Sequence, residues 1–174
     1  MIPLENNLSA IGNIGDGTLD RLSVNITLPL DKTGFTGGTF SFRNDWNKTE
    51  VTDPTTGEKR PISGIRASQA VISLSQDIVS WKTQWGVAYL PRLGQWSYDP
   101  DQTSGWRGRD YFEAYVEHKP TDSLSIRAQV NVWDHFLQER TVYADRAPPR
   151  PIAYIETRDV DPRTFLQIQV RKTF

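Results

Sequence analysis

The sequence predicts an all-β fold, namely an antiparallel, up-and-down segment of a transmembrane β-barrel with about seven strands, which makes an incomplete barrel. Three observations predict this fold class. Apolar and polar residues alternate with a period of two in most of the chain. Short and long connections alternate between the predicted strands. No run approaches the roughly 18 apolar residues that a membrane-spanning helix needs.

The N-terminal half contains four predicted strands. In residues 22–30, leucine, valine and isoleucine fill the even positions, and serine, asparagine, threonine and proline fill the odd ones. Residues 40–46 place aromatic side chains at positions 40, 42 and 46, and residues 69–75 place alanine, isoleucine and leucine at even positions. Residues 81–89 carry tryptophan, valine and tyrosine at odd positions. Each segment therefore has one apolar and one polar face.

The C-terminal half contains three more predicted strands. Residues 112–117 alternate phenylalanine, alanine and valine with polar or charged residues. Residues 123–133 and 166–174 alternate more regularly, and only Lys172 interrupts the apolar face of the last strand. Leu166, Ile168, Val170 and Phe174 form that face, and we expect them to act as the assembly strand of an outer-membrane protein.

The connections divide into two kinds. Residues 31–34, 76–79 and 119–122 are short and contain the Gly, Pro or Asp that tight turns need. The longer connections are predicted at residues 52–64, 91–109 and 144–151. Outer-membrane barrels alternate tight periplasmic turns with long external loops in this way.

The two faces of the predicted strands favour lipid on one side and water on the other. Aromatic residues near the turns, including Phe40, Trp81, Phe112 and Phe174, fit an aromatic girdle at a bilayer interface. The polar face would line the barrel lumen, although in a soluble sandwich it would simply face solvent. The residues predicted to face the lumen are Arg43, Asp45, Gln84, Glu113, Glu117, Arg127 and Arg171.

The composition excludes several function classes. The 174 residues include 20 basic and 21 acidic ones, and this balance argues against a nucleic-acid partner. The absence of cysteine excludes disulfides, thiolate metal sites and a cysteine nucleophile. The two histidines, His118 and His135, are expected to be solvated. Glu113 and Glu117 share a strand face without a partner nucleophile, so we expect no catalytic residue, no metal, no cofactor and no enzyme activity.

The segment 94–109 is the most interesting polar stretch, because aromatic and basic residues alternate in it. Trp96, Tyr98 and Trp106 could stack on a sugar or a planar chelate, and Arg107 and Arg109 could pair with carboxylates of an anionic siderophore. Ordinary loop packing is the alternative. The last hairpin is also basic, with Arg140 and Arg158 among its residues, and nearby acidic residues balance that charge.

Four stretches resemble the C-terminal part of the barrel of a TonB-dependent outer-membrane receptor of the alphaproteobacterial type. Residues 5–31 resemble a strand-to-turn segment, and residues 51–64 an external hairpin. Residues 129–134 resemble part of the penultimate strand, and residues 164–174 resemble the terminal strand with its final Phe. The resemblance covers essentially the whole chain.

The resemblance implies active transport across the outer membrane of a Gram-negative bacterium. In such receptors, external loops capture a ferric siderophore or another large nutrient, and the TonB complex acts on a plug to let it pass. Barrels of this family have about 22 strands, so we expect this chain to be about a third of one. The other strands, the plug that contacts TonB and a signal peptide are expected upstream. The expected partners are outer-membrane lipid, those missing parts and, through the last strand, the barrel-assembly machinery.

Two alternatives stay open. An eighth strand within residues 2–15 would give a small self-contained outer-membrane barrel, although Gly12 and Gly15 make this segment poor strand material. A soluble lipocalin-like binding protein would bury the same apolar face against itself.

Overall fold

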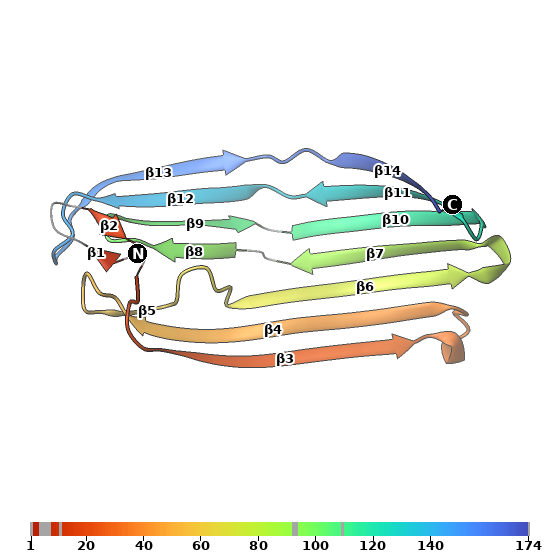
Figure 1. The fold of residues 1–174 in the computed structure, drawn as a ribbon, viewed down its shortest axis with the longest axis horizontal. Helices are drawn as coiled ribbons and strands as arrows, with labels where there is room; N and C mark the ends of the chain where they lie inside the picture. The colour runs from red at the N-terminus through yellow and green to blue at the C-terminus, as the bar shows by residue number, and fades with distance from the viewer. Residues whose placement is uncertain (1, 4–7, 11, 92–93, 109, 174) are drawn as a thin grey trace.

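The computed structural model describes residues 2–3, 8–10, 12–91, 94–108 and 110–173, which form long antiparallel strands lying side by side (Figure 1). In the described ranges, two short 3₁₀ helices, η2 (Asp31–Thr33) and η3 (Val79–Trp81), lie in turns. The strands are β1 (Ile2–Pro3), β2 (Ser9–Ala10), β3 (Gly17–Pro29), β4 (Gly38–Thr52), β5 (Lys59–Arg60), β6 (Ser68–Ile78), β7 (Thr83–Pro91), β8 (Gly94–Tyr98), β9 (Gln102–Gly108), β10 (Asp110–Thr121), β11 (Leu124–Trp133), β12 (Phe136–Tyr143), β13 (Ile152–Val160) and β14 (Phe165–Lys172).

The strands fall into two larger sheets that continue one another. One has the order β14-β11-β10-β7-β6-β4-β3, and the other has the order β13-β12-β9-β8. Pro91 pairs with Asp110 in the first sheet, and Gly94 pairs with Arg107 in the second, so both strands advance by three residues between these pairs. The pairing of β7 with β10 and the pairing of β8 with β9 therefore share one register. Within the described residues, β3, β4, β6, β7–β8, β9–β10, β11–β12 and β13–β14 make seven long strands in chain order.

This arrangement confirms the prediction of an all-β, antiparallel, up-and-down fold. Each of the seven predicted strands overlaps one of the observed strands. The sheet does not close, because β3 lies at one edge and β13–β14 at the other, and no pairing joins them in the described part of the chain. In the described part of residues 2–15, the segment considered as an eighth strand forms the two-residue strands β1 and β2, which pair with each other.

The prediction of a long loop over residues 91–109 is wrong. This segment continues β7 and β10 as β8 and β9, which meet at a tight turn where Asp99 and Gln102 exchange backbone hydrogen bonds. Its Gly, Ser, Asp and Pro residues have low strand propensity. Pairing of β9 with β12 along residues 102–108 supplies the hydrogen bonds that override this propensity.

The strand predicted to begin at Trp81 begins instead at Thr83. Trp81 belongs to η3, and Lys82, with φ of 48°, ends that helix in a left-handed conformation. The neighbouring turn between β3 and β4, at the same end of the sheet, needs Gly37, because a side chain there would collide with the backbone of Asp77, which donates a hydrogen bond to the Gly37 carbonyl.

Register gives the sheet two chemically different faces. One row of directly paired residues crosses all seven strands and is wholly apolar: Leu28, Phe40, Leu74, Val87, Ala114, Val130 and Leu166. The row one residue further along is small or polar except for its proline: Pro29, Thr39, Ser75, Gly86, Tyr115, Gln129 and Gln167. We call the first side the apolar face and the second the polar face.

No second layer covers the apolar face in the described part of the chain. Val51 is the one buried hydrophobic residue among the described residues, whereas Leu166, Ile168 and Val170 are 69%, 68% and 64% exposed. The accessible surface is 11918 Å², and a compact folded monomer of this mass exposes about 8,600 Å². The sheet therefore exposes about 3,300 Å² more than a self-contained domain would.

Gly86 on the polar face gives a first prediction. A Cβ there would lie 2.6 Å from the Tyr115 ring, whose other contacts include the Arg127 guanidinium 3.7 Å from the ring centre. Gly86→Ala should lower the free energy of unfolding by about 1–3 kcal/mol, as overpacking does. Urea unfolding in detergent micelles measures this, with Ser75→Ala, directly opposite in register, as the control. Equal unfolding midpoints for the two variants would contradict the packing described.

Candidate functional site

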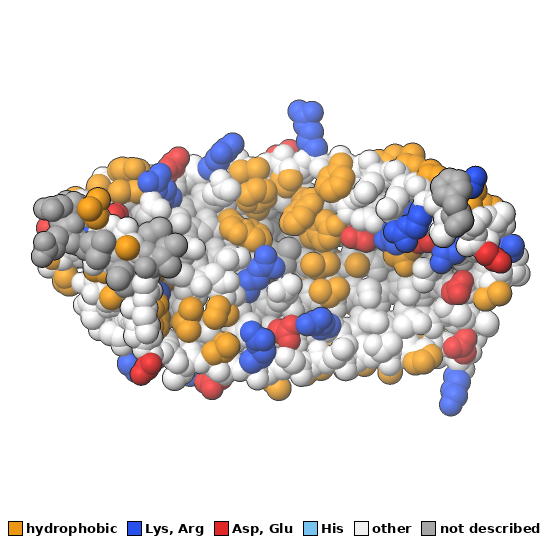
Figure 2. Space-filling model, in the orientation of Figure 1, with side chains coloured by type: hydrophobic (Ala, Val, Ile, Leu, Met, Phe, Trp, Pro, Cys, Tyr) orange, Lys and Arg blue, Asp and Glu red, His pale blue; other side chains and the backbone are white. Residues whose placement is uncertain are grey.

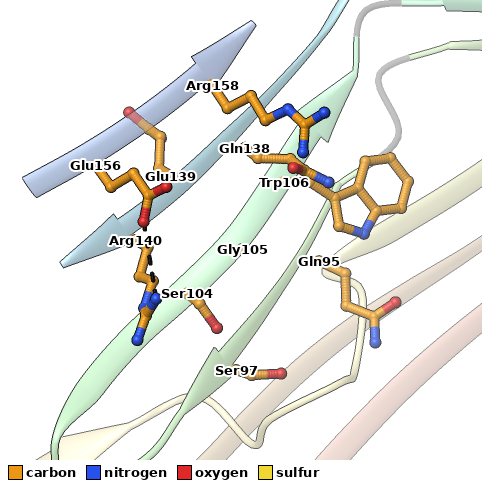
Figure 3. A pocket seen from close by; sticks show the side chains of 10 residues that line it. All are labelled: Gln95, Ser97, Ser104, Gly105, Trp106, Gln138, Glu139, Arg140, Glu156 and Arg158. Atoms are coloured by element: carbon orange, nitrogen blue, oxygen red, sulfur yellow. Dashed lines mark ion pairs between the residues drawn. The ribbon is translucent and has the colours of Figure 1, made fainter. Parts of the chain in front are cut away.

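A hollow of about 400 Å³ lies on β8, β9, β12 and β13, at the end of the sheet away from the C-terminus (Figures 1 and 3). Small residues form its floor, and larger polar side chains rise around them. The lining residues are Gln95, Ser97, Ser104, Gly105, Trp106, Gln138, Glu139, Arg140, Glu156 and Arg158.

Strand register arranges most of these residues in two rows. The first row runs across four strands as Gln95, Trp106, Gln138 and Arg158. The second row, two residues further along each strand, is Ser97, Ser104, Arg140 and Glu156. The hollow exists because the second row begins with two serines beside Gly105, and these small residues leave space between the larger side chains around them. Figure 3 shows the side chains of both rows around this depression.

Trp106 is held in place by two neighbours. Its ring lies 6.1 Å from that of Phe136 in an edge-on arrangement, and the Arg66 guanidinium lies 5.4 Å from the indole centre. Trp106, Phe136 and Trp133 also line a second hollow. Since Trp133 packs against Tyr111 on the polar face, with ring centres 4.4 Å apart, both hollows lie on the polar side of the sheet.

The charges around the hollow are partly compensated. Arg140 lies 3.7 Å from the Glu156 carboxylate, and its Nε donates a 2.6 Å hydrogen bond to Gln102. Arg158 makes no ion pair or hydrogen bond with any described residue. The hollow therefore carries one uncompensated positive charge, with the amides of Gln95 and Gln138 in the same row.

The residues predicted to bind a ligand are not brought together. Trp106 lines the hollow, but Trp96, Tyr98 and Arg107 occupy the alternate positions of their strands. Their side chains also have partners of their own, because Trp96 fills the space beside Gly105, Tyr98 lies under a guanidinium at 5.0 Å, and Arg107 pairs with an acid at 2.9 Å. Arg109 lies outside the described residues.

Sequence reasoning missed most of the hollow. Gln95 and Gln138 carried no signal, since amides are common in any exposed strand. Arg140 and Arg158 were noted only as part of a basic hairpin. The alternation of residues 136–143 with residues 152–160 could have indicated paired strands, which would have placed Arg140 beside Glu156 and Gln138 beside Arg158.

The seven residues predicted to face a lumen all lie on the polar face. Strand alternation puts Arg43 and Asp45 of β4, Gln84 of β7, and the others of β10, β11 and β14 on that side. Figure 2 shows one face of the molecule with charged side chains among polar ones and hydrophobic side chains gathered over its middle.

A hydrogen-bonded network joins β10 to β11 on the polar face. Arg127 lies 3.6 Å from Glu113 and 3.7 Å from Glu117, and it donates two hydrogen bonds to the side-chain amide oxygen of Gln129. Ser125 donates a 2.7 Å hydrogen bond to Glu117. These pairs leave no carboxylate poised as a general base, so the arrangement fits a polar wall.

The long connection 53–67 is fastened to the sheet through Asp53. Arg60 donates a 2.5 Å hydrogen bond to this carboxylate, and the Thr55 and Thr56 amides donate two more. The same loop reaches β8, where the Gly64 amide donates to the Trp96 carbonyl at 2.8 Å. Burial raises the pKa of the Asp53 carboxyl, but the Arg60 and backbone hydrogen bonds outweigh it and hold that pKa below the usual 3.8.

A second fastening ties the turn at Asp101 to the connection 144–151. Arg146 donates hydrogen bonds of 2.5 and 2.7 Å to the two Asp101 oxygens and another of 2.6 Å to the Leu8 carbonyl. The bond from Arg146 lowers the pKa of Asp101 against the opposing effect of burial. The two fastenings order the end of the sheet that carries the hollow.

Comparison of the chain with protein-family models, with curated proteins and with solved structures finds no match. No helix in the described residues is long and apolar enough to cross a membrane. Within residues 2–3, 8–10, 12–91, 94–108 and 110–173, no three His, Asp or Glu side chains are grouped so that they could hold a metal ion.

The lowered pKa of Asp53 predicts acid-sensitive loop order. A carboxyl whose pKa is depressed in the folded state stabilises that state above its unfolded pKa, and the stabilisation is lost as pH falls through the folded pKa. Amide exchange of Gly57 and Gly64, corrected for its intrinsic rate, should stay slow at pH 6 and accelerate below about pH 3.8. Asp53→Asn should show fast exchange already at pH 6.

The control for this experiment is Glu50→Gln, which removes the exposed pair of Glu50 with Lys59 in the same region. Exposed pairs contribute little, so this variant should exchange like the unaltered protein. The assignment fails if Asp53→Asn and Glu50→Gln give the same pH profile.

Proposed function

We propose that this chain forms part of the wall of a transmembrane β-barrel in a Gram-negative outer membrane. The observation that carries the proposal is the exposed apolar face, which crosses all seven strands without a covering layer in the described residues. The excess surface of about 3,300 Å² is several times the roughly 800 Å² that one partner buries in an ordinary interface. The hydrocarbon region of a bilayer can cover such a continuous apolar band without burying polar side chains that lack a hydrogen-bond partner.

Strand length supports a membrane location. A tilted strand needs about 9–11 residues to cross the hydrocarbon region. β3 has 13 residues, β6 has 11 and β10 has 12, so each is long enough. The odd and even positions of these strands differ consistently in polarity, as the wall of a water-filled barrel requires.

The open edges support completion of the barrel by further strands. A barrel in lipid must pair every backbone N–H and C=O group, and β3 and β13–β14 each have one unpaired edge in the described structure. A small self-contained barrel would pair these two strands with each other. Further strands supplied from elsewhere in the same receptor fit the observed sheet better.

At the finer level, we propose a TonB-dependent receptor that imports a ferric siderophore or another large nutrient. In the completed receptor, the polar face lines the lumen and faces the plug, and the TonB complex acts through that plug. The barrel-assembly machinery recognises β14 through Leu166, Ile168 and Val170. This proposal rests on the sequence resemblance together with the up-and-down sheet. Phe174, the remaining member of the assembly strand, lies outside the described residues.

Two neighbouring residues of β14 test the membrane assignment. Ile168→Arg puts a charge on the apolar face, and Gln167→Arg puts the same charge on the polar face. A charge facing lipid near the bilayer centre costs about 2–4 kcal/mol, so Ile168→Arg should reduce the protein retained in lipid vesicles after a urea wash. Gln167→Arg should be retained like the unaltered chain. Equal retention of both variants would contradict the assignment.

A further inference from the structure

We propose that the hollow on β8, β9, β12 and β13 binds an acidic saccharide, with a sugar ring against Trp106 and its carboxylate on Arg158. This inference rests on the proposed function and names the class of solute that the receptor would take. It is carried by the row of four side chains across the sheet, and none of the comparisons assigns a ligand here.

The dimensions of the hollow suit a short saccharide. Adjacent strands lie about 4.8 Å apart, so the row from Gln95 to Arg158 spans about 14 Å. The two rows are about 7 Å apart along the strands. A chain of two pyranose rings laid across the strands would meet an amide, an indole, a second amide and a guanidinium in turn, above a floor of serines.

The polar groups in the first row have free bonding capacity. Neither Gln95 nor Gln138 makes a side-chain hydrogen bond with the described residues, and the same holds for Arg158. Each amide donates and accepts, as sugar hydroxyls also do, so amides and hydroxyls pair reciprocally. Trp106 supplies an apolar surface of fixed orientation, because Arg66 and Phe136 already hold its ring.

The charge pattern selects an acid and places it. Arg140 is engaged by Glu156 and Gln102, so its guanidinium is already partnered. Arg158 has no such partner, and a guanidinium binds a carboxylate through two parallel hydrogen bonds. A ligand with several carboxylates would meet repulsion from Glu156, so the hollow favours one acidic group near Arg158 and neutral hydroxyls elsewhere.

The test compares three probes by calorimetry with the full chain in detergent micelles. Cellobiouronic acid, a disaccharide with a single carboxylate, should bind at least tenfold more tightly than the neutral disaccharide cellobiose. The third probe, 2,3-dihydroxybenzoate, is an anionic aromatic ring without sugar hydroxyls and should bind weakly. Binding of the dihydroxybenzoate in preference to both saccharides would overturn the proposal, as would equal binding of the acidic and neutral saccharides.

Two variants and one control assign the binding to the hollow. Arg158→Gln should weaken cellobiouronic acid binding about tenfold and remove the preference over cellobiose, and Trp106→Ala should weaken both saccharides. Arg163→Gln, an exposed arginine in the connection between β13 and β14, should bind like the unaltered chain. Equal affinities for Arg158→Gln and Arg163→Gln would overturn the assignment.

Membrane insertion is measured separately on the same proteins by vesicle retention. Loss of retention with intact saccharide binding would contradict the proposed function and leave the site standing. Retention without preference for the acidic saccharide would contradict the site and leave the membrane wall standing.

Discussion

Antiparallel register, which in the described strands shifts only between His118 and Thr121 of β10 and between Val142 and Tyr143 of β12, is the constraint on which the rest of this structure depends. Because side chains alternate across a strand, a sheet whose strands all keep register presents whole rows of residues to one side. The row through Leu28 and Leu166 is apolar across seven strands, and the next row, through Thr39 and Gln167, is small and polar. A slip of one residue in any strand would place its apolar side chains among the charged groups of the opposite face.

The same register builds both polar features of the molecule. Along β10 and β11 it places Glu113, Glu117 and Arg127 within reach of one another, and the resulting network satisfies their charges. Along β9, β12 and β13 it places Trp106, Gln138 and Arg158 in one row, where the Gln138 and Arg158 side chains make no hydrogen bond with the described residues. The first arrangement suits a wall, and the second suits a place where a solute is held.

The fold class followed from the sequence because alternation is a local signal that the sheet then repeats. Residues 123–133 and 166–174 alternate regularly, and both coincide closely with observed strands. Residues 94–108 could not be recognised as strands from composition, since Gly94, Gly105 and the serines between them lower strand propensity. Their strand conformation depends on pairing with β12, a partner some thirty residues away. The ligand residues were misplaced for the same reason: a loop has no defined faces, whereas a strand separates Trp106 from Trp96 and Arg107.

The central claim is that the apolar face contacts lipid and the polar face contacts water. Because the chain has no cysteine, single spin labels can be placed at consecutive positions 112–117 of β10 in vesicle-reconstituted protein. The account predicts that labels at the even positions collide with dissolved oxygen, which concentrates in lipid, and that labels at the odd positions collide with a water-soluble nickel complex. The same accessibility at all six positions, or the opposite alternation, would contradict it.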